Sequence, residues 1–328
     1  MRQLFTAQTR KEIKRTCKER VMDNLGRCIG IQFLYSLPFV LLALMLYWVM
    51  FGRVFSMIMS GNADSYRLAM TLSSGMNSVW LVLFLMLVIG GPLSLGLMRF
   101  YVGLQRGEEP GVGTLLTPFT SLRSIWAGIK MEFCLAFRSF LWMIGPIIVY
   151  SVLVSVVVFS AAMRGSTEVQ VPVVILYVLF VIALIPIEIK VMTYSAGWVL
   201  LSDDETRSVW EATREASVAF KGQFGKLFVF VFSFIGWYIL LFGVTYLCIG
   251  LGVAGLLVVK GGIGIAVLVA TSIAAICVLI VLGAFLNAYE MTSFFGVYEY
   301  LSAPPAEPQD TPFDHSWSGQ DGDGGAPL

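Results

Sequence analysis

Residues 132–162 read EFCLAFRSFLWMIGPIIVYSVLVSVVVFSAA, an almost wholly apolar stretch with one arginine, Arg138, inside it. A helix needs roughly 20 residues of this kind to cross about 30 Å of hydrocarbon. The stretch therefore predicts a transmembrane helix, and the rest of the chain can be searched for others by the same criterion.

Five further stretches meet that criterion. The six predicted spans are 29–51, 78–102, 132–162, 171–199, 226–259 and 263–298. The last two exceed what one bilayer requires, so their ends are expected to tilt or to project beyond the lipid. We predict an all-α membrane protein with six transmembrane helices and amphipathic cytoplasmic helices.

The composition agrees with a chain that lies mostly in lipid. Of its 328 residues 57% are hydrophobic and 13% are charged, and the mean hydropathy is +0.81. Soluble domains carry about 25% charged residues. The net charge of +1 gives no bias toward nucleic acid, and none is expected as a partner.

The distribution of Lys and Arg predicts the orientation. With the N-terminus inside, the inner segments hold sixteen of these residues and the outer loops four. Cytoplasmic loops of membrane proteins carry the excess of positive charge. We therefore predict a multi-pass membrane protein with both termini in the cytoplasm. The basic start is too long for a cleavable signal peptide.

Three regions follow from this reading: a basic amphipathic N-terminal helix over 1–28, the six-helix domain over 29–300, and an acidic tail over 301–328. The tail is rich in Pro, Gly, Ser and Asp. Such a composition cannot bury a core, so the tail is predicted to be disordered.

Two segments outside the spans have helical amphipathic patterns. Residues 8–25 place apolar side chains four apart among basic ones, and residues 203–221 follow a capping box of Ser202 and Glu205. Each is expected at the inner surface, with packing against the membrane domain as the alternative. Trp210 and Phe220 are expected to be buried there. The predicted lipid or partner surface comprises Lys11, Lys14, Lys18, Trp210, Phe220 and Lys221. Anionic lipid headgroups are the expected partner at this face, and a cytoplasmic protein is a further candidate.

The sequence offers little for catalysis. The one histidine, His315, lies in the tail, and no nucleophile, metalloprotease or phosphate-loop motif occurs. The five cysteines fit no zinc or disulfide framework. Asp203-Asp204-Glu205 is predicted to favour a helix start, with a divalent-cation site as the alternative. No catalytic residue, metal or cofactor is expected.

Polar side chains within the spans are candidates for function, because ionisable groups in a bilayer cost free energy. The candidate intramembrane polar site comprises Arg138, Glu188, Lys190, Asn287 and Glu290. Arg138 and Glu188 are predicted at similar depth on neighbouring helices, where they would pair, with Lys190 turned toward the headgroups. The pair is either a structural lock or a site for a lipid headgroup, ion or proton.

Several spans also contain residues that weaken helices, including Gly90-Gly91-Pro92 and Pro186. Backbone groups freed at such positions must be satisfied by neighbouring helices or by a polar cavity. A kink that improves packing is the simpler interpretation.

Two stretches resemble a known family. Residues 185–237 contain Pro186, Lys190 and Tyr194, then the Lys221–Gly222 pair, and end in SFIGW at 233–237. GGPLSLG at 90–96 and the aromatic pattern of residues 289–298 continue the likeness. These features resemble an uncharacterised bacterial integral-membrane family, domain of unknown function nine hundred seventy-five. The resemblance covers most of residues 8–300 and implies a six-span inner-membrane protein without an assigned activity.

The expected function is that of a non-enzymatic membrane protein: an accessory, scaffold or envelope-maintenance factor. The alternative is a small transporter or permease with a polar site near Arg138, Glu188 and Lys190. A water-filled cavity that reaches these charges would favour transport, whereas a flat apolar or basic inner face would favour a scaffold.

Overall fold

Helices account for nearly all of the ordered structure. The computed structural model describes residues 5–59, 65–164, 170–259 and 262–303, and no strand occurs among them. The elements are α1 (Ala7–Asp23), α2 (Leu25–Met59), α3 (Ser65–Arg106), the 3₁₀ helix η1 (Val112–Thr120), α4 (Leu122–Met163), α5 (Gln170–Ser195), α6 (Gly197–Asp203), α7 (Val209–Ala219), α8 (Phe224–Phe232), α9 (Ile235–Val258) and α10 (Gly262–Ser302).

The prediction of six spans is confirmed. In the described part of the chain, six helical segments are long and apolar enough to cross a membrane. Two of them are interrupted near one end, where α5 gives way to α6 and α8 to α9. Six apolar helices of this length indicate a multi-pass membrane protein.

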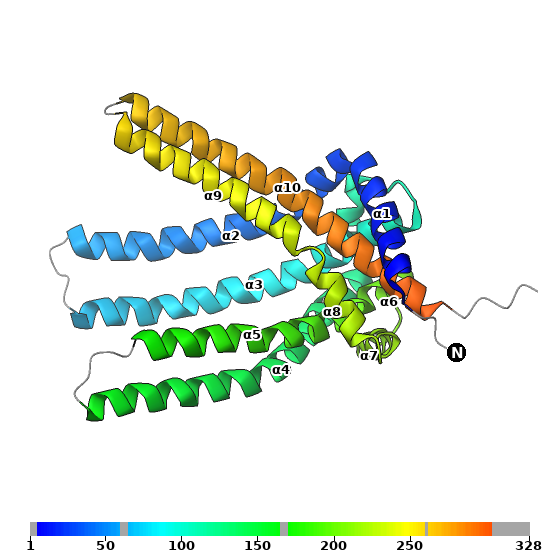
Figure 1. Ribbon diagram of the computed structural model, residues 1–328, viewed down its shortest axis with the longest axis horizontal. Coiled ribbons are helices and arrows are strands. Elements are labelled where there is room, and N and C mark those ends of the chain that lie inside the picture. The colour runs from blue at the N-terminus through cyan, green and yellow to red at the C-terminus, as the bar shows by residue number, and fades with distance from the viewer. Residues whose placement is uncertain (1–4, 60–64, 165–169, 260–261, 304–328) are drawn as a thin grey trace, which may run out of the picture.

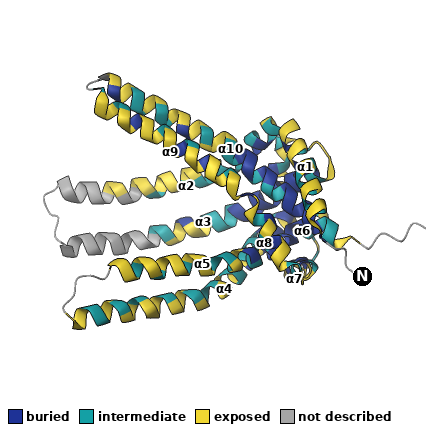
Figure 2. Ribbon diagram, in the orientation of Figure 1, coloured by how far each residue is buried: buried dark blue, intermediate teal, exposed yellow. Residues whose placement is uncertain are grey.

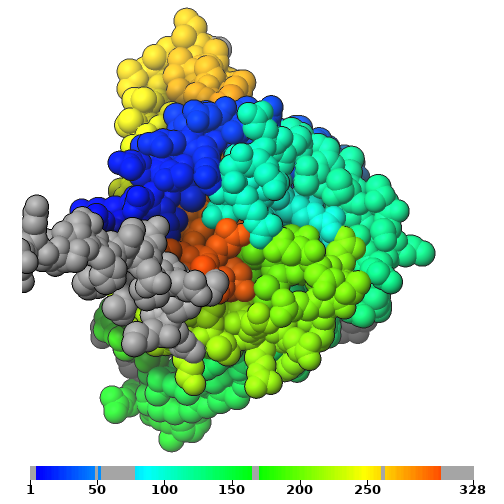
Figure 3. Space-filling view, turned by 90° about the vertical axis from the view of Figure 1, so that its right-hand side faces the viewer, coloured from blue at the N-terminus to red at the C-terminus, as the bar shows by residue number. Residues whose placement is uncertain are grey.

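The spans form three hairpins, α2–α3, α4–α5 and α9–α10 (Figure 1). All three extend in one direction from a compact end, which we call the cap. The cap contains α1, η1, α6, α7 and α8 together with the adjoining ends of the long helices. Seen from the cap side, the end of α10 lies at the centre, surrounded by α1, the η1 region and the α7 region (Figure 3).

The buried core lies in the cap rather than between the spans (Figure 2). The most apolar window of Leu122–Met163 has no buried residue, whereas half of the corresponding window of Ser78–Arg106 is buried. A membrane helix can remain exposed in this way because lipid tails solvate apolar side chains as well as other apolar side chains do. The three hairpins therefore contact one another mainly at their cap ends.

A direct backbone-to-backbone contact joins α3 to α4. A Cβ atom added at Gly91 would lie 2.6 Å from the backbone nitrogen of Ile129, and one at Gly128 would lie 2.6 Å from the carbonyl oxygen of Gly91. The backbones touch here because neither residue carries a side chain, which is how small residues serve membrane helix pairs. α3 continues through Pro92 beside this contact.

The apolar stripe of α1 is packed inside the protein. Cys17 and Val21 are buried, and α1 contacts α10. On the far side of α10, Phe220 is 3% exposed and stacks on Phe294 with ring centroids 5.4 Å apart. Both amphipathic segments thus pack against the membrane domain, which was the alternative to lying free on its surface.

The second amphipathic segment differs from its prediction in two ways. It is not one helix over 203–221, because α6 ends at Asp203 and α7 begins at Val209. The prediction of a capping box is wrong, because its two side chains have other partners. The hydroxyl of Ser202 donates to the carbonyl of Val199, and Glu205 forms an ion pair with Arg99. Phe220 is buried as predicted, but Trp210 is 53% exposed.

Some predictions concern residues outside the described ranges. The tail beyond residue 303, with His315, is among them. Lys260, one of the four basic residues counted in the predicted outer loops, is another.

Candidate functional site

Arg138 is held by aromatic rings. Its guanidinium carbon lies 3.9 Å from the centroid of Trp210 and 4.6 Å from that of Tyr194, and Nη2 donates to the carbonyl of Trp210 at 3.4 Å. The predicted ion pair with Glu188 is wrong, because Glu188 is exposed and no salt bridge joins the two described side chains. Aromatic faces attract a cation without bringing a second charge into the membrane.

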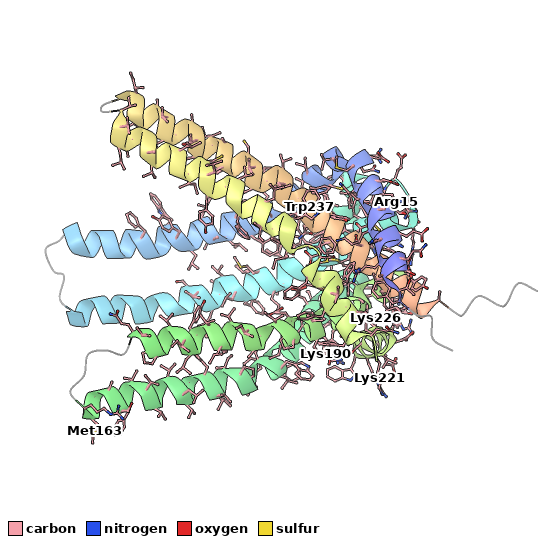
Figure 4. The ribbon with its side chains drawn as sticks, viewed as in Figure 1. Arg15, Met163, Lys190, Lys221, Lys226 and Trp237 are labelled. Atoms are coloured by element: carbon pink, nitrogen blue, oxygen red, sulfur yellow. The ribbon has the colours of Figure 1, made fainter. Side chains whose placement is uncertain are left out.

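Lys190 turns toward α7 in the cap. Its Nζ donates to the hydroxyl of Ser217 on α7 at 2.8 Å and lies 5.0 Å from the ring centroid of Tyr194. A groove of about 360 Å³ lies beside it and is also lined by Lys221. Figure 4 shows both lysines at the cap, Lys190 within α5 and Lys221 just after α7. Arg138 and Lys190 therefore share Tyr194, and α7 completes the cluster.

Asn287 belongs to a separate polar cluster. The hydroxyl of Tyr101 lies 3.1 Å from Oδ1 of Asn287 and 3.1 Å from Oε1 of Gln32, so a buried tyrosine connects α3 to α10 and α2. Both amide groups also line a groove of about 580 Å³ between α2 and α10. Its other lining residues are mostly apolar, with Gly283 and Ala284 among them.

Glu290 lies at the break between α8 and α9. Its carboxylate accepts a hydrogen bond from Tyr238 on α9. Lys14 of α1 donates to the hydroxyl of Ser233 at 2.8 Å and lies 3.9 Å from the ring centroid of Phe234. Burial is the first cause that lowers the pKa of Lys14, nearby Arg10 lowers it further, and Glu290 acts in the opposite direction. The break is thus closed by a lysine from another helix.

The three lysines predicted to face lipid on α1 therefore differ in environment. Lys14 is turned inward, Lys18 lies 5.4 Å from the ring centroid of Trp237, and Lys11 is exposed. Because two of them contact aromatic rings at the start of α9, they fasten α1 to the membrane domain. Trp237 and Arg15 mark this region in Figure 4.

The acidic run Asp203-Asp204-Glu205 does not start a helix, because α6 ends at Asp203, and no group of three or more possible metal ligands occurs among the described residues. Asp203 pairs with Arg106, which also pairs with Glu299 of α10. Asp204 accepts from the backbone and side chain of Thr206, and these bonds lower the pKa of its carboxyl. Each carboxylate is thus matched by a donor nearby.

A basic groove beside this run was not predicted from the sequence. It has a volume of about 590 Å³, lies between α4 and the segment from α6 to α7, and is lined by Arg123, Trp126, Lys130, Arg207 and Trp210 among others. Arg123, Trp126 and Lys130 are spaced three and four apart, a helical pattern that could have revealed one half of it. The other half comes from a segment about 80 residues away.

Comparison with known proteins identifies the family. The model of the family described as protein of unknown function (DUF975) matches residues 1–302. The chain belongs to this family. No curated protein and no solved structure matches the chain.

The stretches that resemble the DUF975 family coincide with close contacts in the fold. GGPLSLG contains Gly91, which touches α4, and Gly96, where an added Cβ would lie 2.3 Å from the carbonyl oxygen of Leu115. SFIGW spans the break between α8 and α9 that receives Lys14. These stretches have identifiable packing roles, and none of them forms a recognisable catalytic arrangement.

Proposed function

We propose that this protein is a non-enzymatic scaffold of the bacterial inner membrane that holds a transmembrane helix of a partner protein in the groove between α2 and α10. The cap would lie in the cytoplasm, together with both termini. The sixteen-to-four distribution of basic residues supports this orientation. The compact cap and the exposed spans support a role in holding membrane helices.

The groove between α2 and α10 carries the proposal. The hydroxyl of Tyr101 lies 3.1 Å from an amide oxygen of Gln32 and of Asn287, and its one proton is donated to one of them at a time; neither amide nitrogen donates to another described residue. Lipid tails cannot accept a hydrogen bond, and an unsatisfied polar group in hydrocarbon is costly. A partner helix with a polar side chain or an accessible carbonyl can supply the missing acceptors.

The shape of the groove suits a helix. Gly283 has no neighbour within 4 Å of an added Cβ, so its surface is open. Ala284 lies next to it on the lining. Small residues allow two helix backbones to approach closely, and polar side chains then hydrogen-bond across the interface.

Photocrosslinking in cells tests this function. A photoreactive amino acid at Ile280, which lines the groove, should yield a discrete protein adduct. The matched position is Val178 on α5, which is also exposed. Adding Gly283→Leu should fill the groove and remove the Ile280 adduct. Lipid adducts alone at Ile280, or the same protein adducts at both positions, would refute the scaffold.

Transport is a second candidate, and the break between α8 and α9 favours it. Interrupted membrane helices often bind ions or substrates, and this break lies beside Glu290 and Lys14. The alternative site near Arg138, Glu188 and Lys190 has less support, because Glu188 lies apart from the others. A proton flux into proteoliposomes driven by a pH gradient, abolished by Glu290→Gln and kept in Glu188→Gln, is the expected result. Equal flux in protein-free vesicles would reject this candidate.

A further inference from the structure

The basic groove beside α4 combines cations with tryptophans. Arg123 and Lys130 are exposed, and neither forms a salt bridge with a described residue. The acidic side chain that lines the groove, Glu205, is already paired with Arg99 and accepts from Ser124. Arg207 adds a third cation, which pairs with Glu215. The groove therefore retains an excess of positive charge.

The groove lies where α4 leaves the cap. Trp126, which lines the groove, and Leu122, the first residue of α4, are both exposed. Further along the same helical face, three and seven residues after Lys130, come Phe133 and Phe137, which are exposed and stacked. Tryptophan is enriched where membrane helices meet water. Along this face of α4, the basic and tryptophan side chains near the start of the helix are followed by apolar aromatic rings.

We propose that this groove binds the phosphate headgroup of an anionic phospholipid. Arg123 and Lys130 would hold the phosphate, because a guanidinium donates two parallel hydrogen bonds and an ammonium supplies a point charge. The acyl chains would follow Phe133 and Phe137 along α4. The first turn of α7 adds backbone donors, since its N-cap Ser208 forms no side-chain cap bond.

The apolar face of α4 distinguishes a lipid from a soluble phosphate compound. A free phosphate ester would contact the cations and leave the exposed aromatic side chains uncovered. Asp204 is exposed near Arg123 but does not line the groove, and its carboxylate accepts hydrogen bonds from Thr206. The lipid site is also distinct from α1, whose Lys14 and Lys18 contact aromatic rings. It does not depend on the proposed partner helix.

Lipid titration of the full chain in detergent tests the site. Native mass spectrometry would follow bound phosphatidylglycerol, with phosphatidylcholine as the neutral reference. Near a membrane surface each basic side chain contributes about fivefold in affinity, so Arg123→Gln with Lys130→Gln should weaken phosphatidylglycerol binding by about 30-fold. The control, Arg15→Gln with Lys226→Gln, removes the same charge from exposed cap residues and should change binding less than twofold.

Two further measurements test the lipid site even if the glutamine variant folds poorly. The conservative variant Arg123→Lys with Lys130→Arg should retain binding. In the unaltered protein, a photoactivatable phosphatidylglycerol should label residues 122–137 and 206–210. Labelling confined to α1, equal loss in the control variant, or unchanged binding in the glutamine variant would overturn the site. Displacement by equimolar glycerol 3-phosphate or inorganic phosphate would show a phosphate site rather than a lipid site.

Discussion

Arg138 and Glu188 should respond differently to neutralisation, although both are charged residues within predicted spans. Arg138→Gln removes a cation from between Trp210 and Tyr194 and should lower the free energy of unfolding by about 0.5–2 kcal/mol. Glu188→Gln changes an exposed side chain and should alter it by no more than about 0.5 kcal/mol. Thermal unfolding in nanodiscs measures both. Rescue of Arg138→Glu by Glu188→Arg would restore the ion-pair interpretation.

Cys17 should be almost inert to thiol reagents in the folded protein. Burial raises the pKa of its thiol to about 11. The thiolate is the reactive form, so at pH 8 only roughly one molecule in a thousand would react readily. Maleimide should therefore label Cys17 far more slowly than a cysteine placed at exposed Gln8, and denaturant should remove the difference. Equal labelling rates would mean that α1 does not stay docked.

The same thiol makes stability depend on alkaline pH. In the unfolded chain the thiol ionises near its ordinary pKa of 9.0, below its folded value. The stabilisation is therefore complete below pH 9 and is lost as the pH rises toward 11. Cys17→Ala should flatten that part of the pH profile of thermal stability.

The sequence showed that Arg138 needs a partner inside the protein, but it did not show that the partner is an aromatic ring and not a carboxylate. A charge within an apolar span requires compensation, which is evident for Arg138 from the sequence. The compensation comes from Trp210, on a helix whose placement depends on how α6 and α7 break. Because that break follows from tertiary contacts such as the Arg99–Glu205 pair, local sequence does not reveal it.

The contact between α3 and α4 should be sensitive to a single methyl group. Gly91→Ala would place a Cβ 2.6–2.7 Å from the backbone of α4, which cannot move aside as a flexible side chain can. Overpacking of this kind costs about 1–3 kcal/mol. Gly145→Ala is the control within α4, because nothing lies within 4 Å of its added Cβ. We expect a clear fall in the melting temperature for Gly91→Ala and none for Gly145→Ala. Equal effects would place the contact elsewhere.

At the element scale, the apolar runs located the six spans because burial in lipid requires length and hydrophobicity, which local sequence encodes. The ends were less predictable. The run 226–259 contains the break at Ser233 and Phe234, which no proline marks. Conversely, Gly90-Gly91-Pro92 suggested a weakened helix, yet α3 continues through it and uses Gly91 for contact. Glycine serves both purposes, and only the neighbouring helix distinguishes them.

Cysteines placed at the two ends of the molecule should differ in their reaction with a thiol reagent that cannot cross the membrane. Met163 lies at the hairpin end and Arg15 at the cap end (Figure 4). In intact cells, a membrane-impermeant thiol reagent should modify Met163→Cys and spare Arg15→Cys, and permeabilised cells should label both. The native cysteines are replaced beforehand. The reverse pattern would invert the proposed orientation, and labelling of both in intact cells would contradict a cap held on one side.

The arrangement of the hairpins could not be read from the sequence. Lipid-facing positions and helix-facing positions are both apolar, so hydropathy does not tell which spans touch. The core of the cap was also underestimated, because its aromatic residues, among them Phe220, Phe230 and Phe294, are scattered over three helices. Family resemblance supplied the membrane class but no geometry. The grooves therefore became visible only in the structure.

The Gly91–Gly128 contact lies near one end of α4, so the two ends of this helix lie at very different distances from it. Met163 lies about 50 Å from Gly128 along the helix, at 1.5 Å per residue. A tilt of about 5° around this fulcrum would move the distal end by about 4 Å, because displacement grows with arm length. Arg123 lies on the short arm, about 8 Å from the same point. A small adjustment around a headgroup there would be magnified roughly sixfold at the opposite face of the membrane.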